Sequence, residues 1–544
     1  MATSGTLTQD VGAPVATGVG PVTTVPAAAR PTAPPLPALT VRPLVRPLPA
    51  AWTPDRVAAV LERLPHAAFF ESAGPDRESG PWTLLAFDPL WQVEVREGRL
   101  RRVLGVGAGA AGPRESREGG GSGGVHSLPP PRDRGDLGPA LEALSRVWPV
   151  HVAYEPSPPI PFVSGLAGSL AYDLKDLFER YPVRARREWP HPDLLLGFYD
   201  VVFGWCRETG EAWAVSTGFD GRSADEARAA ARLDAAWSRL SAAFEAVPDW
   251  AAAALVHPDE PTWGALAPIA TSNFTRDQYL RVVERALEHI ADGDIYQVNL
   301  AQRFWVEPAP APAALYRRLR AVAPAPFLAY AALPDGGGIA SSSPERFFSI
   351  RGSRIEAWPI KGTRPRGRSP EEDAALAEAL RASEKDRAEN LMIVDLERND
   401  LGRICEIGSI RVPALWEVET HSNVHHLVSR VVGELRPEFG PVEILRALFP
   451  GGSITGAPKI RAVEIIDALE PVRRGVYTGA VGYWDASGDA DWNIAIRTVT
   501  VGRGAASFHA GGGIVADSTP EGEYEETLVK ASGMMRALGV KRAR

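Results

Sequence analysis

A lysine in an apolar segment is the residue of this sequence best suited to covalent chemistry. Lys361 follows Trp358-Pro359-Ile360 and precedes two arginines, Arg364 and Arg366. Burial and nearby positive charges lower the pKa of a lysine, and the neutral amine can attack carbon. The pattern predicts a reactive lysine at a strand end, although a surface lysine beside a turn has the same local pattern.

Two pairs of carboxylates, each with a spacing of three residues, could hold a metal ion. The pairs are Asp386 with Glu389 and Glu523 with Glu526, and Lys530 follows the second pair. Residues 369–395 predict one helix, which begins with a serine cap and a proline, and Thr519 begins a second. Residues three apart share a helix face, and Mg²⁺ prefers oxygen ligands. The spacing alone fits a magnesium site, but also two solvated helix faces with ordinary salt bridges.

Two glycine-rich segments and one arginine are candidates for binding a carboxylate. Residues 451–459 look like a phosphate-binding loop, but Ala457-Pro458 replace the lysine and hydroxyl residue that such a loop requires. Backbone N–H groups around Ser453, and those of residues 511–513, remain available to an anion. Arg497 ends an otherwise apolar strand, so we expect it in an ion pair or bound to a carboxylate.

Three histidines lie close together in the sequence. His421 and His425 have the spacing of zinc ligands, but no third ligand stands at a matching distance. We expect His426 to face a pocket instead, as a hydrogen-bond donor.

Length and composition are those of an ordinary soluble enzyme. The 544 residues exceed one simple core and predict two or three domains or one composite domain. The net charge of −8, without a basic stripe, argues against nucleic-acid binding, and no apolar run reaches 18 residues, so no membrane span is expected. The only cysteines, Cys206 and Cys405, exclude a disulfide framework and fit the reducing cytoplasm.

Two segments are expected to lie outside the fold. Residues 1–50 are rich in Ala, Pro, Thr and Val and lack the pattern of a secretory signal, which predicts a disordered extension. Residues 105–136 contain a Gly/Ser run and three consecutive prolines, which predict a flexible insertion in a loop.

The rest of the chain mixes strands and helices without the regular alternation of a doubly wound fold. Predicted strands cover 67–72, 82–89, 162–174 and 194–205, and predicted helices cover 223–246 and 275–290. We expect an α+β protein built on antiparallel sheets.

These motifs together resemble one known family. Residues 274–538 are similar to the chorismate-binding domain shared by anthranilate synthases, aminodeoxychorismate synthases and isochorismate synthases. The matching blocks, in order, are 293–300, 343–347, 359–363, 386–390, 393–400, 426–429, the Ser453 loop, Arg497, 511–517 and the Glu523/Glu526 helix. The resemblance implies large antiparallel sheets packed as a sandwich flanked by helices, with a catalytic domain at 271–540. Residues 51–250 resemble the family's N-terminal domain more loosely.

Two blocks look like the aminodeoxychorismate synthase branch of this family. They are residues 296–302 and the Pro-Ile-Lys-Gly-Thr motif around Lys361. Anthranilate synthase component I usually has alanine at the position of Lys361. The resemblance therefore implies amination of chorismate at C4, which leads to 4-aminobenzoate and folate or to a related secondary metabolite.

The resemblance also implies residue roles. Neutral Lys361 would attack C2 of chorismate, Glu345 would protonate the C4 hydroxyl as it leaves, and ammonia would then displace the lysine. Glu345 accordingly needs a raised pKa. Glu389 and Glu526 would bind Mg²⁺, with Asp386 and Glu523 holding its waters. The implied substrate-binding residues are His426, Ser453, Tyr477, Arg497, Gly512, Gly513 and Lys530.

Partners follow from the same resemblance. Neither cysteine stands in the sequence context of a glutaminase nucleophile, so a separate glutamine amidotransferase subunit is expected to supply ammonia. Phe70-Glu71-Ser72 is similar to a segment that lines a tryptophan site, which makes tryptophan a candidate ligand at Ser72.

Two alternatives stay open. Anthranilate synthase component I would release 2-aminobenzoate and pyruvate from the same substrate. A silent, tryptophan-binding regulatory subunit would need a broken site, whereas Glu345, Lys361, Glu389 and Glu526 are all present.

Overall fold

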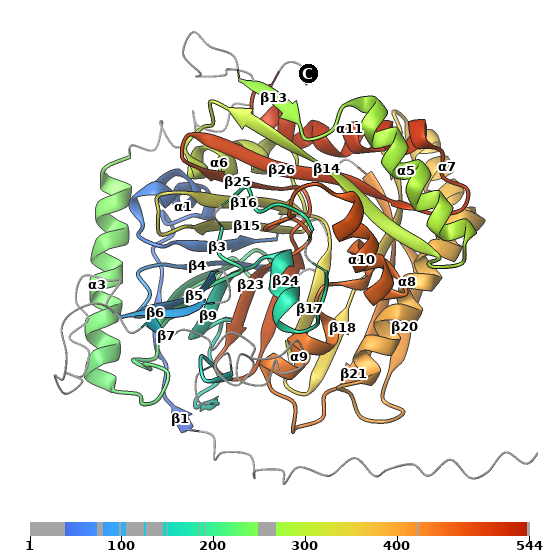
Figure 1. Ribbon diagram of the computed structural model, residues 1–544. Helices are drawn as coiled ribbons and strands as arrows, with labels where there is room; N and C mark the ends of the chain where they lie inside the picture. The colour runs from blue at the N-terminus through green and yellow to red at the C-terminus, as the bar shows by residue number, and fades with distance from the viewer. Residues whose placement is uncertain are drawn as a thin grey trace, which may run out of the picture. The chain divides into compact units, whose positions relative to one another are not determined.

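Two large antiparallel sheets organise the chain in the computed structural model (Figure 1). The structure describes residues 39–72, 80–96, 99–104, 125–126, 145–148, 151–182, 184–189, 191–247, 268–421 and 424–540. The predicted insertion at 105–136, apart from residues 125–126, and residues 1–38 of the predicted extension lie outside the described residues.

Each sheet has 12 strands. The first contains, in spatial order, β19 (Ile360–Pro365), β21 (Val424–Glu434), β18 (Arg354–Ala357), β17 (Arg346–Arg351), β24 (Ala490–Ile494), β23 (Ala480–Asp485), β9 (Gly165–Leu170), β10 (Leu194–Tyr199), β5 (Trp91–Arg96), β6 (Arg99–Leu104) and β7 (Val125–His126), with β20 (Arg411–Thr420) paired to β21. The second contains β13 (Ile269–Ser272), β14 (Gln297–Glu307), β26 (Ala505–Ile514), β25 (Thr498–Gly502), β16 (Gly338–Ser343), β15 (Phe327–Ala332), β3 (Ala68–Glu71), β4 (Trp82–Ala86), β11 (Val201–Cys206), β12 (Ala212–Ser216) and β2 (Leu44–Pro47), with β22 (Gly456–Ala457) paired to β14.

Nine α-helices lie among the described residues. They are α1 (Pro54–Val60), α3 (Glu226–Glu245), α5 (Arg276–Ala291), α6 (Pro312–Val322), α7 (Pro370–Ala382), α8 (Glu384–Gly402), α9 (Pro441–Leu448), α10 (Lys459–Leu469) and α11 (Pro520–Ala537). Three short 3₁₀ segments, η1 (Leu61–Arg63), η3 (Tyr172–Leu177) and η4 (Gly452–Ile454), complete the set. None of the described helices combines the length and apolar character that crossing a bilayer requires.

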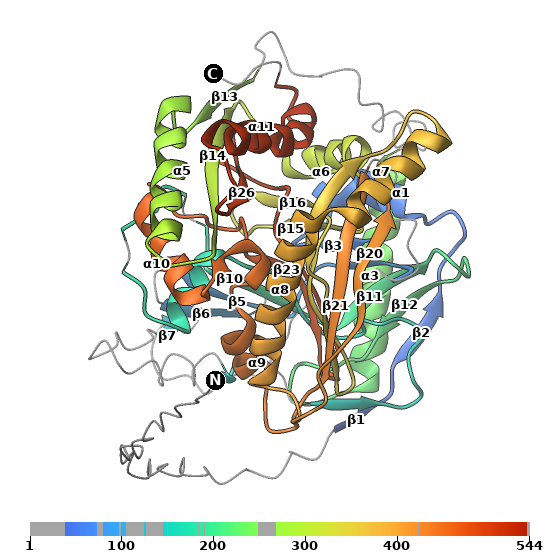
Figure 2. The ribbon, with the colours of Figure 1, turned by 90° about the vertical axis from the view of Figure 1, so that its right-hand side faces the viewer.

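Apolar side chains from both sheets meet in shared clusters, which fits the predicted sandwich. Leu195 of β10 and Val481 of β23, in the first sheet, pack with Ala331 of β15 and Ile339 of β16, in the second. The other faces are covered by helices: α8 and α9 pack on the first sheet, and α1, α3, α6 and α11 on the second. Figure 2 shows α8 alongside β20 and β21. The expected α+β class with flanking helices is therefore confirmed.

The two expected domains share both sheets. In the first sheet β9, from the N-terminal half, lies between β23 and β10, and in the second sheet β3 pairs with β15. Residues from both 51–250 and 271–540 also contribute to the same hydrophobic clusters.

Strands at the N-terminus and around Asp200 differ from the predictions. The segment expected to be disordered contains β1 (Leu39–Val41), which pairs in parallel with β8 (Val152–Tyr154), and also β2. Disorder is thus the wrong prediction for residues 39–47. The single strand predicted at 194–205 is two strands, β10 and β11, which turn at Asp200 and enter different sheets. A continuous apolar run hides such a turn, because both strands are buried on both faces.

The helix predicted at 369–395 is broken at Ser383. This residue has extended backbone angles (φ −67°, ψ 108°), and its side chain accepts a hydrogen bond from the Asp386 N–H, so it ends α7 and caps α8. The second helix then continues to Gly402. By contrast α5 and α11 begin at the predicted caps, Thr275 and Thr519.

Candidate active site

Lys361 lies on β19, where a bulge directs its side chain. Ile360 pairs with Val428 and Thr363 with His426, so Lys361 and Gly362 together stand opposite one residue of β21. Gly362 has φ +82°, and a Cβ there would meet the Asp386 side chain at 2.9 Å. Only glycine fits this backbone and this close approach. The Lys361 Nζ donates to the carbonyl oxygen of Ser453 at 3.1 Å.

Burial is the main reason why the pKa of Lys361 lies below its usual value. The carboxylates of Glu345 and Glu389 oppose this effect, and the Lys530 ammonium reinforces it. The arginines that the sequence suggested as the neighbouring cations are paired elsewhere. Arg364 lies 2.8 Å from Asp386, and Arg366 lies 2.7 Å from Asp373. The cation that acts on Lys361 comes from α11 instead, which sequence adjacency does not indicate.

Glu345 lies next to Lys361 in a buried position between β16 and β17. Its backbone N–H donates to the Ser343 hydroxyl at 3.2 Å, and that hydroxyl donates to the Ile494 carbonyl at 2.6 Å. Burial raises the pKa of Glu345 to about 6, while the Ser453 hydroxyl and the Lys361 ammonium lower it. Its Oε1 has no hydrogen-bond partner among the described residues. The carboxyl can therefore hold a proton close to neutral pH and has an atom available to a ligand.

The Ser453 turn faces Lys361 with a carbonyl, not with the N–H groups expected from its glycines. The Ser453 carbonyl accepts from Lys361 and also from Asn299 Nδ2 at 2.8 Å. The N–H of Gly452 donates to Glu397 on α8 at 3.3 Å. The Ser453 hydroxyl is buried and acts on the Glu345 carboxyl, whose pKa it lowers. The turn therefore places this hydroxyl beside the acid of the site.

The second acid pair meets the glycine-rich strand β26. A Cβ on Gly512 would lie 2.7 Å from Glu523 Oε2 and 3.2 Å from Glu526 Oε1. The bare Cα therefore lets both carboxylates approach the strand. Ser518 donates to Glu523 Oε1 at 2.6 Å, whereas the buried Oε2 has no described partner.

The two acids of the first pair, Asp386 and Glu389, have different partners. Glu389 interacts electrostatically with Lys361 and with Glu526 of the other pair, so α8 and α11 present these acids to the same region. Asp386 is instead held by Arg364. Lys385 lies 3.9 Å from Glu389, and Lys530 lies 2.6 Å from Glu526. Each of these two glutamates thus has a lysine of its own helix beside it.

These acids fit a magnesium ion better than a zinc ion. The described residues contain no ready cluster of three acidic, histidine or cysteine ligands, but Mg²⁺ is commonly held by one or two carboxylates and several waters. The unpartnered Glu523 oxygen and the cradle at Gly512 meet that requirement. The histidines do not support zinc, because both ring nitrogens of His425 are hydrogen-bonded, to Thr420 and to Asp373.

The remaining residues predicted to bind the substrate lie at two different sites. Arg497 is partly buried with a left-handed backbone (φ +50°), and the charge of Glu345 acts on it, so it lies at the Lys361 site. His426 also belongs there, since its Nδ1 is 3.0 Å from Thr363 on β19. Burial keeps the pKa of His426 well below its usual value, so the ring is neutral.

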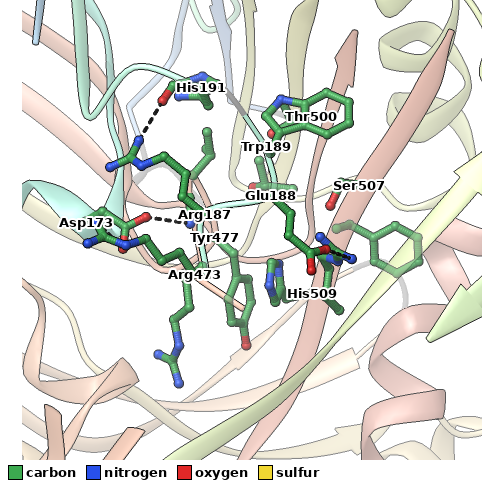
Figure 3. Close-up of a pocket in the computed structure, with 16 residues that line it drawn as sticks. Asp173, Arg187, Glu188, Trp189, His191, Arg473, Tyr477, Thr500, Ser507 and His509 are labelled. Carbon is green, nitrogen blue, oxygen red and sulfur yellow. Dashed lines mark hydrogen bonds and ion pairs between the residues drawn. The ribbon is translucent and has the colours of Figure 1, made fainter. Parts of the chain in front are cut away.

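Tyr477 lies in the wall of another cavity. Figure 3 shows it beside His509, on which its ring stacks at 5.0 Å, with Arg473 and Trp189 in the same lining. The lining of this cavity includes neither Lys361 nor Glu345. Gly513 borders Asn299, because a Cβ there would meet the Asn299 amide oxygen at 2.8 Å.

Ser72 follows β3 and lines a third cavity between the sheets. Arg351, Tyr483 and Asp491 contribute to the same lining. Arg351 and Asp491 pair with each other at 3.6 Å, and Asp491 also pairs with Arg346 at 3.1 Å.

Some residues of the site were given no role from the sequence, although Asn299 and Thr363 stand inside matching blocks. Asn299 binds Ser453, Thr363 binds His426, and Ser518 binds Glu523. Glu397 was quoted only as part of a block, yet it lies on the buried face of α8 with Ile393 and Val394. A charged residue at a core position of a helix is the signal that could have found it.

The chain is similar to known proteins over most of its length. The family of chorismate binding enzymes matches residues 139–536. Anthranilate synthase component 1 of Bacillus caldotenax is 41% identical over 70% of this chain and 75% of that protein. Aminodeoxychorismate synthase component 1 of Klebsiella aerogenes is 41% identical over 71% of this chain and 79% of that protein. The crystal structure of anthranilate synthase component I from Streptococcus pneumoniae matches with a TM-score of 0.68 and 31% identity, covering 84% of this chain and 92% of that one.

Proposed function

This chain belongs to the family of chorismate binding enzymes, and we propose that within it the chain aminates chorismate at C4. The product would be 4-amino-4-deoxychorismate, the precursor of 4-aminobenzoate and folate, and the chain would act as an aminodeoxychorismate synthase component I. Overall sequence identity does not distinguish this activity from anthranilate synthesis. An anthranilate synthase component 1 and an aminodeoxychorismate synthase component 1 are each 41% identical to this chain.

The observation that carries the proposal is the environment of Lys361. Its amine lies against the Ser453 carbonyl, its pKa is lowered by burial, and Glu345 stands beside it with a raised pKa. A nucleophile with a lowered pKa next to an acid with a raised one suits a displacement in which a hydroxyl leaves. A reaction that ends in anthranilate has no evident need of this lysine.

The chemistry proceeds in two displacements. The neutral Lys361 amine forms a bond to C2, the two conjugated ring double bonds shift by one position, and the C4–O bond breaks as Glu345 gives its proton to the leaving hydroxyl. Ammonia then forms a bond to C4, both double bonds shift back, and the bond between C2 and Lys361 breaks. The proton that the new C4 ammonium group loses returns to Glu345. The sum is chorismate plus ammonia giving aminodeoxychorismate plus water.

We assign Glu389 and Glu526 as the residues that hold Mg²⁺, with Glu523 and Asp386 at its waters. When bound, the ion neutralises the ring carboxylate of the substrate. Arg497 and the N–H groups near Gly512 orient the other carboxylate, because a partly desolvated arginine and a run of glycines, which lets an anion approach the backbone, favour a carboxylate. The neutral His426 ring and the Ser453 hydroxyl complete the binding of the polar ring substituents.

Ammonia comes from a separate glutamine amidotransferase subunit in this proposal. Both cysteines of the chain are buried, and burial raises the pKa of the Cys405 thiol to about 11, the reverse of what an activated nucleophile needs. The name of the component 1 relatives agrees with a second component. Free buried thiols also accord with a cytoplasmic location.

Product identification tests the proposal. The purified chain is incubated with chorismate, Mg²⁺ and ammonium at mildly alkaline pH, and the products are separated and identified by mass. We expect aminodeoxychorismate, which an added lyase converts to 4-aminobenzoate. Anthranilate with pyruvate would instead establish the alternative function, and no turnover of chorismate would favour the regulatory subunit.

The lysine variant gives the matched comparison. Lys361→Ala should abolish the 4-aminated product, and a covalent adduct on Lys361 should accumulate in the native chain when ammonia is withheld. Full activity of this variant with ammonia would contradict the covalent role. The chain alone should be inert with glutamine, and glutamine turnover by the pure chain would overturn the separate subunit.

A further inference from the structure

Glu397 is a buried carboxyl that lies outside the acid pairs and behind the reactive lysine. It belongs to α8, like Glu389, but it faces the core, where only 5% of the residue is exposed. The charged groups that face it are Glu345, Asp400 from its own helix and Lys459 from the start of α10. A buried acid in this position needs a structural or catalytic reason, because burial of an unpaired carboxylate is costly.

The contacts of Glu397 lead directly to Lys361. The Gly452 N–H donates to Glu397 Oε1 at 3.3 Å, and a Cβ on Gly452 would meet the same oxygen at 3.1 Å and Leu396 Cδ2 at 2.6 Å. The turn therefore lies against α8 with no space for a side chain. The next residue, Ser453, offers the carbonyl that accepts the Lys361 amine.

We propose that Glu397 is a positioning residue, whose carboxyl fixes the Gly452–Ser453 turn so that the Ser453 carbonyl directs the Lys361 amine at the substrate. The inference rests on the proposed function of Lys361, and it extends it to a residue that touches no substrate. It predicts that the reactivity of Lys361 depends on an acceptor atom at position 397.

The charge of Glu397 matters as well as its position. Burial first, and then the Asp400 carboxylate, raise its pKa to about 8, while Lys459 acts in the opposite direction. Glu397 is therefore uncharged at neutral pH. An ionised carboxylate there would repel the Glu345 carboxylate, so a neutral acceptor is the form that suits this site.

Two variants separate the acceptor from the fold. Glu397→Gln keeps an oxygen acceptor of the same shape and cannot ionise, whereas Glu397→Leu removes the acceptor and keeps the volume. We expect kcat of Glu397→Leu to fall about 100-fold, as for a displaced catalytic group, with the KM for chorismate changed less than about twofold. Glu397→Gln should stay within about threefold of the native chain at pH 7. The exposed Asp395→Asn, on the same helix, is the control, and circular dichroism and melting temperature verify folding.

A second readout does not require turnover. The rate at which Lys361 is acylated by a small anhydride, followed by peptide mass spectrometry, reports the reactivity of this amine directly. Glu397→Leu should change this rate at least about threefold, and Glu397→Gln should not. Equal rates and equal kcat in the native and Leu chains would overturn the proposal, as would a Gln variant as impaired as the Leu variant. A native chain that makes anthranilate refutes the proposed function alone, because the labelling result stands independently of the product.

Discussion

The guanidinium of Arg364 lies 2.8 Å from the carboxylate of Asp386, and this pair ties the strand of Lys361 to the helix of Glu389. Both groups are partly buried, with 33% and 16% of their side chains exposed. The contact keeps the negative charge of Asp386 from acting alone near the lysine.

Removal of this pair should make Lys361 harder to deprotonate. In Arg364→Gln the Asp386 carboxylate becomes an unpaired anion close to the strand of Lys361, and this change favours the protonated amine. We expect the pKa of Lys361 to rise by about one unit, measured by labelling of the amine as a function of pH. Arg366→Gln is the control, because Arg366 pairs with Asp373 at a more exposed place. Equal titration curves in all three chains would contradict the prediction.

The pH profile of the native enzyme should be bell-shaped. The reaction needs Glu345 protonated, a state that is lost as pH rises through about 6, and Lys361 neutral, a state that is lost as pH falls. Glu345→Gln removes the first requirement and the proton donor together. Its kcat should be about 10²- to 10⁴-fold lower, and the residual rate should rise with pH to a plateau. A bell-shaped pH profile in this variant would show that the proton donor is another residue.

The acids of α11 should control the response to magnesium. Glu526→Gln is expected to need at least about 100-fold more Mg²⁺ for half of its maximal rate, and Ser518→Ala, which loses the partner of Glu523, about 10-fold more. Glu525→Gln, one position away on the exposed face of the helix, should titrate as the native chain does. Removal of Mg²⁺ by a chelator should stop native turnover reversibly. An unchanged titration in Glu526→Gln would refute the assignment of this ligand.

The stability of the fold should depend on Glu397 in a defined pH window. Its pKa in the folded chain is about 8, whereas a glutamate in an unfolded chain titrates near about 4.3. The folded state therefore retains a proton that the unfolded state releases, and stability is lost as pH rises from the lower value to the higher one. Glu397→Gln has no such loss. The melting temperature of this variant relative to the native chain should increase from pH 5 to pH 8, and parallel curves would exclude the raised pKa.

Tryptophan should stabilise the chain through the cavity at Ser72. Arg351 and Asp491 line this cavity as an ion pair, whose two charges match the carboxylate and the ammonium group of an amino acid. We expect tryptophan to raise the melting temperature of the native chain and to have little effect on Asp491→Asn. A shift of equal size in both chains would place the ligand at another site, and leucine serves as the control ligand.

Local sequence patterns predicted those parts of the site that depend on helix caps and on spacing. Thr519 caps α11 as expected, and Glu523 and Glu526 therefore share a face, because a helix fixes that geometry by itself. The bulge at Lys361 could not be derived in this way. It depends on the register between β19 and β21, which is set by pairing over a long distance in sequence.

The charges that act on Lys361 also could not be predicted from the neighbouring sequence. Arg364 and Arg366 are close to Lys361 in sequence, but their own partners neutralise them, whereas Lys530 reaches the lysine from a helix near the end of the chain. Ser383 is a further case, because a serine inside an apolar periodic pattern is compatible with one helix or with two, and tertiary packing decides.

The shared sheets have a consequence for the order in which the protein is made. Leu170 of β9 pairs with Ala480 of β23, and Phe69 of β3 pairs with Tyr330 of β15, so strands synthesised early wait for partners that leave the ribosome much later. Neither sheet can complete its strand pairing before most of the chain has left the ribosome. Such distant pairings slow folding and leave strand edges unprotected in the nascent chain. The catalytic half, expressed as a fragment, would lack the strands that its own sheets require, and a growing chain of this kind is a natural client for chaperones.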